Sequence, residues 1–295
     1  MHLAAAPGYR DQELSAARLK NSDMSDQLLG EKIPIPSKYD PGILYPIPRW
    51  AARSLLDIDK KLLMYGLDHW HAYELSWLNG RGKPQVAIGE FYFSSDSENI
   101  VESKSLKFYL YSFNREQFDC AEKLAAIISN DLSAVSKSEV QVSLTLLPDL
   151  QAAPVQSRIG KSIDALDISI QSTQPDPALL QIEDAAVFDE QLYSDLFKSL
   201  CPVTNQPDWA SFEIQYTGTK INEASLLAYL CSFREHQGYH EECAERIYRD
   251  ITRVCRPVEL SIVLNFLRRG GLDINVYRSS EPVGLEVVKA RLVRQ

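Results

Sequence analysis

The sequence predicts an α+β protein made of two tandem modules, each an antiparallel sheet backed by two helices. The main observation is an internal repeat, because residues 105–113 and 225–233 are identical at six of nine positions. Two further observations support the duplication. Apolar residues recur at helical spacing in both copies, and a segment of strict apolar–polar alternation follows each copy. Runs of antiparallel strands with helices on one face are typical of the α+β class.

Each module is expected to contain a strand, two helices and another strand, with a further strand on either side. The first strand covers residues 85–94 in one half and 211–217 in the other. The first helix is indicated by Leu106, Tyr109, Leu110 and Phe113, and by Leu226, Tyr229, Leu230 and Phe233. The second helix is indicated by Leu124, Ile127, Ile128 and Leu132, and by Cys243, Ile247, Ile251 and Val254. The closing strand alternates through Val140, Val142, Leu144 and Leu146, and through Val258, Leu260, Ile262 and Leu264.

These elements divide the chain into four parts. We expect an N-terminal extension over 1–40, a first module over 41–150, a connecting segment over 151–190 and a second module over 191–295. The two halves differ where polar residues cluster, and complementary clusters in opposite halves favour one composite site over two separate ones.

Composition limits the possible functions. The net charge is −9 and the longest basic run is Arg268-Arg269, which argues against a nucleic-acid groove. The sequence contains no apolar run of membrane-spanning length and no secretory signal, so we expect a soluble cytoplasmic protein. Five cysteines without a Cys-x-x-Cys pair fit a reducing compartment, with each thiol either buried or reactive.

Cys201 is the candidate nucleophile. Pro202 and Pro207 exclude a regular helix, so the thiol lies in a loop before a strand that begins near Trp209. Asp208 can fold back toward the thiol and accept its proton, which matters because a free thiol is only slightly ionised at neutral pH. The structural alternative is a small apolar residue in a turn, with Asp208 capping the loop.

Two other polar groups offer binding functions. His240 and Glu241 lie near the start of a helix, where His240 is a candidate proton donor and Glu241 a candidate anchor for the N–H groups of a purine. Helix capping by Glu241 and a surface position for His240 are the alternative. The segment Glu102-Ser103-Lys104, taken in isolation, is better explained by a capping acid and a solvated lysine than by a binding function.

The remaining motifs are less specific. Arg269 and Gly270 belong to an Arg-Arg-Gly-Gly segment that reads as a β-turn, and its arginines also suit a phosphate. Cys201, His240 and Cys243 are residue types that bind zinc, but they include no closely spaced ligand pair, so we predict no metal site. Neither a G-x-G-x-x-G nor a Walker motif occurs.

Four segments in order resemble the 7-cyano-7-deazaguanine reductases, the nitrile reductases of queuosine biosynthesis, in their long two-module form. The segments are Glu102-Ser-Lys-Ser-Leu-Lys107, the run from Cys201 to Trp209, the run from Ser232 to Cys243, and Arg268-Arg-Gly-Gly-Leu-Asp-Ile-Asn275. The likeness covers nearly everything from about residue 68 onward, apart from the connecting stretch. It implies the tunnelling fold, which GTP cyclohydrolase I shares, and a homodimer that does not bind nucleic acid directly.

The resemblance also implies roles for individual residues. Cys201 would add to the nitrile of the substrate to give a thioimide, while Asp208 and His240 would move protons. Glu241 would hold the deazaguanine together with Val101, Glu102 and Ser103 from the other half. The NADPH contacts implied are Ser103, Lys104, Arg269 and Gly270, and two NADPH are needed because a nitrile passes through an imine to reach an amine.

The sequence departs from the family at Val276-Tyr277, where Pro-Trp is usual, and this bears on the fit of the cofactor. A protective disulfide between Cys201 and Cys243 is a further hypothesis. The alternatives to a nitrile reductase are a zinc-dependent cyclohydrolase of the same fold and a non-catalytic purine-binding or assembly protein.

Overall fold

The computed structural model describes residues 36–58, 62–150, 158–170, 172–288 and 291–295. Its first half contains the helices α2 (Arg49–Leu55), α3 (Ser103–Tyr111) and α4 (Ala121–Ser136), and the strands β1 (Pro46–Pro48), β2 (Tyr65–Leu78), β3 (Pro84–Ser94), β4 (Asn99–Val101) and β5 (Val140–Leu146). Its second half contains the helices α5 (Glu223–Cys231) and α6 (His240–Cys255), and the strands β6 (Lys161–Ser162), β7 (Ile182–Ser194), β8 (Lys198–Leu200), β9 (Pro207–Ile221), β10 (Glu259–Phe266) and β11 (Leu272–Ser279). The α+β class and the repeated order of elements are confirmed.

The repeated residues make equivalent contacts in both halves. Tyr109 of α3 donates its hydroxyl to Asp131 of α4 at 2.6 Å, and Tyr229 of α5 donates to Asp250 of α6 at 2.7 Å. Both first helices then tighten into a 3₁₀ turn, which is stabilised by the serine that follows each of them in the repeat. The identity at these positions therefore reflects the tie between the two helices of each module.

The two modules form one continuous sheet. Its strand order is β5-β3-β2-β11-β10-β9-β7-β6, with β8 paired to β9 at the side, and every pairing is antiparallel except that of β6 with β7. Strand β2 of the first half pairs with β11 of the second from Leu272 opposite Ala72 to Ser279 opposite Tyr65. We refer to this pairing as the seam. Strand β7 begins inside the range that the sequence indicated as a connection.

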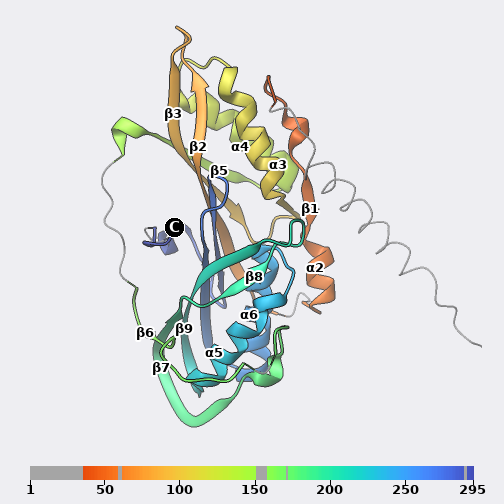
Figure 1. Ribbon diagram of the computed structural model, residues 1–295, viewed down its shortest axis with the longest axis vertical. Helices are drawn as coiled ribbons and strands as arrows, with labels where there is room; N and C mark the ends of the chain where they lie inside the picture. The colour runs from red at the N-terminus through yellow and green to blue at the C-terminus, as the bar shows by residue number, and fades with distance from the viewer. Residues whose placement is uncertain (1–35, 59–61, 151–157, 171, 289–290) are drawn as a thin grey trace, which may run out of the picture.

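The helices cover one face of the sheet and create the core there. In Figure 1, α3 and α4 lie beside the end of the sheet that carries β2 and β3, while α5 and α6 lie near β9. Alternate side chains of the strands, such as Phe91, Phe212 and Leu264, are completely buried against these helices. Among the described residues no helix is long and apolar enough to cross a membrane.

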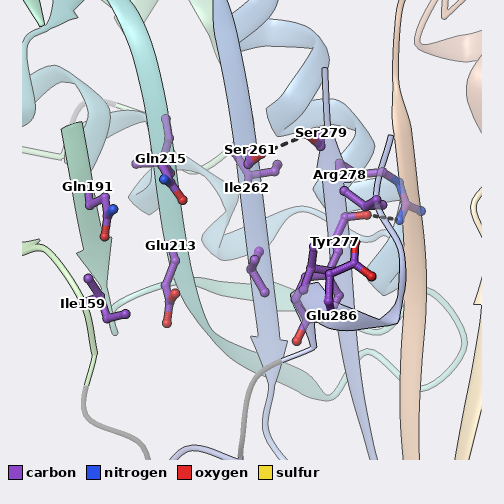
Figure 2. Close-up of a pocket in the computed structure, with 14 residues that line it drawn as sticks. Ile159, Gln191, Glu213, Gln215, Ser261, Ile262, Tyr277, Arg278, Ser279 and Glu286 are labelled. Carbon is purple, nitrogen blue, oxygen red and sulfur yellow. Dashed lines mark hydrogen bonds between the residues drawn. The ribbon is translucent and has the colours of Figure 1, made fainter. Parts of the chain in front are cut away.

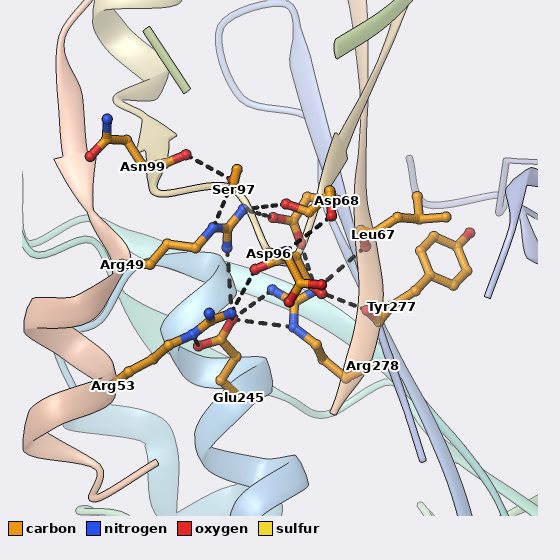
Figure 3. Close-up of polar contacts among 12 residues, drawn as sticks. Arg49, Arg53, Leu67, Asp68, Asp96, Ser97, Asn99, Glu245, Tyr277 and Arg278 are labelled. Atoms are coloured by element: carbon orange, nitrogen blue, oxygen red, sulfur yellow. Dashed lines mark hydrogen bonds and ion pairs between the residues drawn. The ribbon is translucent and has the colours of Figure 1, made fainter. Parts of the chain in front are cut away.

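A cluster of buried ion pairs, which we call the seam cluster, lies on the helix side of the seam (Figure 3). Arg278 of β11 contacts Asp68 of β2 at 2.7 Å and Glu245 of α6 at 2.9 Å. Arg49 of α2 also binds Asp68, and Arg53 binds Glu245 at 2.7 Å. The cluster thereby ties both modules and α2 together.

The charged form of each buried side chain in the seam cluster is stabilised by its ion-pair partners. Burial raises the pKa of Glu245, but the positive charge of Arg278 and the hydrogen bond from Arg53 outweigh this effect and lower that pKa to about 2. Bringing these ions out of water is costly, so the arrangement stabilises the fold only while it is complete.

Replacing Arg278 with leucine is expected to lower the free energy of unfolding by about 3–5 kcal/mol, because Asp68 and Glu245 lose the cation between them. Urea unfolding followed by circular dichroism measures this change. Lys123→Ala removes an exposed ion pair with Asp119 and is the control, expected to leave the midpoint unchanged. An unchanged urea midpoint in Arg278→Leu as well would show that the seam cluster does not stabilise the fold.

Candidate active site

A small pocket lies where α3 of the first half approaches α6 and the start of β9 in the second half. Its empty volume, counted together with the open solvent at its mouth, is about 350 Å³. The first half contributes Trp70, Ile100, Val101, Glu102 and Ser103, and the second half contributes Cys201, Pro202, Val203, Asp208, Gly238, Tyr239, His240, Glu241 and Arg269. The composite arrangement means that neither module forms this pocket alone.

Cys201 lies in a short closed loop between β8 and β9. Its backbone N–H donates to the carbonyl of Gln206, and the N–H of Asn205 donates back to the carbonyl of Cys201, both at 2.9 Å. Asn205 has a φ of 55°, the left-handed conformation that asparagine tolerates better than most residues. The loop therefore fixes the position of the thiol, which is partly exposed on the pocket wall.

Asp208 lies at the start of β9 and is buried next to a cation. The Nη2 atom of Arg269 is 3.1 Å from Asp208 Oδ1. Burial raises the pKa of this carboxyl, and the charges of Arg269 and Lys107 offset part of the increase. Asp208 is consequently a stronger base than an exposed aspartate. Among the described contacts no hydrogen bond joins its side chain to Cys201.

His240 is the first residue of α6, and its ring packs edge-on against Phe266 at 4.2 Å between centroids. Burial, together with the charges of Arg269 and Lys107, lowers the pKa of this imidazole to about 3. The ring is therefore neutral at pH 7, and its Nε2 atom, 3.8 Å from Asp208 Oδ2, makes no ion pair there. A neutral imidazole has one N–H donor and one acceptor nitrogen, so at this position it can relay a proton without holding a second one.

Glu241 is a pocket-lining residue with a buried carboxylate. The residue is 4% exposed, and its Oε1 atom has no hydrogen-bond partner in the described part of the chain. Burial and the negative charge of Asp68 raise its pKa to about 7, while Arg49 and Arg278 of the seam cluster limit the increase. An unpaired buried acceptor is costly, so this geometry favours a ligand that donates N–H groups.

The first half provides a capping motif at the same pocket. Glu102 caps α3 by accepting from the backbone N–H groups of Lys104 at 3.0 Å and Ser105 at 2.6 Å. The capping alternative is thus present, and each carboxylate oxygen still has a second lone pair for a ligand. Val101 is buried beside it at the end of β4, and Ser103 lines the pocket.

Arg269 and Gly270 lie in a tight hairpin between β10 and β11. Gly270 and Gly271 have φ values of 60° and 77°, which the central residues of a two-residue hairpin turn require. A side chain at Gly270 would come within 3.1 Å of Lys107 Nζ. The turn prediction is correct, and the turn holds Arg269 against both Asp208 and Gln206.

Comparisons with known proteins show the family of this chain. The family model described as "Nitrile reductase, 7-cyano-7-deazaguanine-reductase N-term" matches residues 35–144, and the model described as "QueF-like protein" matches residues 207–283. The proteins named NADPH-dependent 7-cyano-7-deazaguanine reductase from Burkholderia multivorans and Burkholderia cenocepacia are 47% and 46% identical to this chain. Each alignment covers 85% of this chain and 92% of the relative. The chain belongs to the 7-cyano-7-deazaguanine reductase family.

The matched ranges of this reductase family contain most of the predicted site. The first contains Val101 to Lys104, and the second contains Asp208, His240, Glu241, Arg269 and Gly270. Cys201 precedes the second range by six residues, so its assignment rests on its loop and pocket. Every predicted site residue lines the pocket except Lys104 and Gly270. These two residues directly follow Ser103 and Arg269, which do line it.

Sequence reasoning did not single out three further polar or aromatic residues at this candidate site. Trp70 lines the pocket with an indole N–H that has no partner among the described residues, and Tyr239 lines it beside His240. Lys107 lies behind the pocket with Ser103, His240 and Arg269. Lys107 ends the Glu102–Lys107 motif, so its position in that run was a usable signal. No sequence pattern singled out Trp70.

The cysteine predictions have mixed outcomes. Cys231 and Cys255 are buried in the core, which is one of the two environments expected for the thiols. Cys201 and Cys243 are both free thiols, and Cys243 is fully buried beneath the pocket, so their disulfide stays a prediction. Among the described residues, the group near this pocket that could hold a metal ion is His236, Glu242 and Cys243. Cys201, His240 and Cys243, which the sequence did not support as a zinc site, are not grouped.

A larger pocket of about 830 Å³ lies on the opposite, open face of the sheet (Figure 2). Gln191, Glu213, Gln215 and Ser261 reach it from three neighbouring strands. It contains none of the predicted site residues and no thiol, so we place the chemistry in the smaller pocket.

Glu241→Gln is expected to flatten the dependence of stability on pH. Because burial raises the pKa of Glu241 in the folded state, ionising this group between about pH 4.5 and pH 7 costs folding free energy, and stability falls as pH rises. The cost is on the order of 1–3 kcal/mol. Urea unfolding at pH 5 and pH 8 should give a smaller difference in the variant than in the original chain. Equal differences would contradict the burial of an ionisable Glu241.

Proposed function

We propose that the chain reduces the nitrile of 7-cyano-7-deazaguanine to the aminomethyl group of 7-aminomethyl-7-deazaguanine with NADPH, through a covalent thioimide on Cys201. The observation that carries this proposal is the composite pocket, which is lined by a thiol, by a buried base and by a buried carboxylate with one unpaired oxygen. The relatives' names supply the reaction, and the pocket supplies groups suited to it. The reaction belongs to the biosynthesis of queuosine, and we expect a cytoplasmic homodimer.

The deazaguanine is held by carboxylates from both halves. Glu241 accepts N–H groups of the base through its unpaired oxygen, and the rigid helix cap keeps Glu102 on the other side of the pocket. Val101 and Ser103 complete this wall, where a planar base would also lie against Trp70. Because a bound base supplies the hydrogen bonds that Glu241 lacks, binding favours the ionised form of Glu241.

Cys201 then adds to the nitrile carbon. Asp208, whose pKa burial has raised, accepts the thiol proton and delivers it to the nitrile nitrogen. A carbon–sulfur bond forms and the triple bond becomes a carbon–nitrogen double bond, so the product is a neutral thioimide with no change of redox state. Neutral His240 next to Asp208 provides a path by which that carboxylate recovers a proton for later steps.

Four electrons must reach the former nitrile carbon, and NADPH supplies them as two hydrides in successive binding events. The residues proposed to hold it are Ser103, Lys104, Arg269 and Gly270. They fit a phosphate-bearing cofactor because Lys107 and Arg269 gather positive charge beside a hairpin with little side-chain bulk. After the first reduction the carbon–sulfur bond breaks, the thiolate of Cys201 leaves, and a buried imine awaits the second reduction away from water.

Intact-protein mass spectrometry with 7-cyano-7-deazaguanine and no NADPH tests the covalent step. We expect a mass increase of one substrate per chain, lost on addition of NADPH and absent in Cys201→Ala, because only that thiol lines the pocket. Cys120→Ala is the matched control, since Cys120 is also a partly exposed free cysteine and lies in the other half.

Absence of an adduct on folded, reduced protein would overturn the thioimide proposal. An adduct that survives in Cys201→Ala and disappears in Cys120→Ala would move the nucleophile to the first half. NADPH-dependent turnover without any adduct would support the overall reduction and contradict the covalent route through Cys201.

Arg269→Ala is expected to raise the KM for NADPH by about tenfold or more, the value of one lost charge-assisted contact. The kcat should also fall because Arg269 pairs with Asp208, so the KM for NADPH is the diagnostic quantity. Arg268→Ala is the control, because the Arg268 guanidinium lies over the ring of Tyr73, 3.5 Å from its centroid. An unchanged KM for NADPH in Arg269→Ala would remove Arg269 from the cofactor site.

A further inference from the structure

A second polar cluster lies on the open face of the sheet, behind the candidate pocket. The strand register places His71 of β2 directly between Glu90 of β3 and Asp273 of β11, and it places His69 opposite Tyr92. Successive side chains of a strand point to opposite faces, so His69 and His71 project away from Trp70, which faces the pocket. The proposed reductase mechanism uses none of these open-face residues.

Three of these side chains converge on one point. His69 Nε2 is 3.2 Å from Glu90 Oε1, and His71 Nε2 is 3.5 Å from the same oxygen. One ligand atom from each of the three residues lies within 4.8 Å of the others. Two ligand atoms that are each about 2.1 Å from a tetrahedral zinc ion lie about 3.4 Å apart. The separations between Glu90 and the two imidazoles therefore already match the edges of such a site.

Outer contacts orient the ligands as metal sites commonly require. The Nδ1 atom of His71 is 2.7 Å from Asp273 Oδ1, which directs Nε2 toward Glu90. Asp273 is itself held by the hydroxyl of Tyr73 at 2.6 Å and by the side-chain amide of Asn275 at 3.0 Å. His69 is fixed by stacking on Tyr92, with ring centroids 4.5 Å apart.

We propose that His69, His71 and Glu90 bind one divalent transition-metal ion of the zinc type. The ligand set is two imidazole Nε2 atoms and one carboxylate oxygen, with water in the remaining position. The side chain of Glu90 is 30% exposed and that of His71 14%, so an ion and its water can enter from solvent. Glu90 and Asp273 on either side of His71 concentrate negative charge where the cation binds.

The ion would act on the seam rather than on the reaction. It links β2 to β3 through its ligands, and it couples to β11 through the bond between His71 and Asp273. The two halves meet at β2 and β11, so a bound ion should stiffen the sheet directly behind Trp70 and the pocket. The proposal is independent of the reductase activity, and its test does not use turnover.

The experiment begins with the full chain stripped by a chelator and dialysed. Zn²⁺ is then titrated against a chromophoric chelator, and Co²⁺ binding is followed by visible absorption. We expect one ion per chain, the absorption of four-coordinate Co²⁺, and a melting temperature raised by about 5 °C when free Zn²⁺ is a hundredfold above its dissociation constant. His71→Asn and, separately, Glu90→Gln should each weaken Zn²⁺ binding at least tenfold.

His236→Asn is the matched control, because His236, Glu242 and Cys243 form the other described group that could hold a metal ion. This variant should retain the Zn²⁺ affinity of the original chain.

Circular dichroism and melting curves of the stripped variants verify that they fold. If His71→Asn does not fold, the Zn²⁺ affinity of Glu90→Gln still tests the proposal. No stoichiometric binding would show that the cluster is only a hydrogen-bonded network. Binding that is unchanged in both His71→Asn and Glu90→Gln, or lost only in His236→Asn, would also overturn the proposal.

Discussion

Strand β11 pairs with β2 along its whole length, and the rest of the structure depends on this seam between the two halves. The pairing turns two modules into one sheet, which allows α3 of the first half and α6 of the second to approach the same pocket. The seam cluster stabilises it from the helix side, because Arg278 of β11 binds Asp68 of β2 and Glu245 of α6. A shift of one residue in this register would move every side chain of β11 to the other face of the sheet.

The candidate active site acquires its electrostatic properties from this shared burial. The same low-dielectric environment raises the pKa of Asp208 and Glu241 and lowers that of His240, because in each case burial disfavours the charged form. The seam cluster contributes directly, since Asp68, Arg49 and Arg278 all act on Glu241. The groups proposed to move protons and to hold the base are therefore tuned by the contacts that join the modules.

The sheet separates two kinds of polar site. Trp70 faces the pocket on the helix side, while its neighbours His69 and His71 join Glu90 on the open face. Period-two alternation along β2 is sufficient to produce this separation. One strand thus connects the candidate reductase site with the proposed metal site, through backbone that the seam holds rigid.

The sequence by itself determined the repeat, the helix pairs and the alternating strands, because local periodicity reports which face of each element is buried. Its motifs also made Cys201, Asp208, His240 and Glu241 the candidate site residues. The merging of both modules into one sheet, the position of Lys107 behind the pocket and the convergence of His71 with Glu90 and Asp273 were decided only by the tertiary structure. Strand register and side-chain burial depend on partners far away in the chain, and local patterns contain no information about those partners.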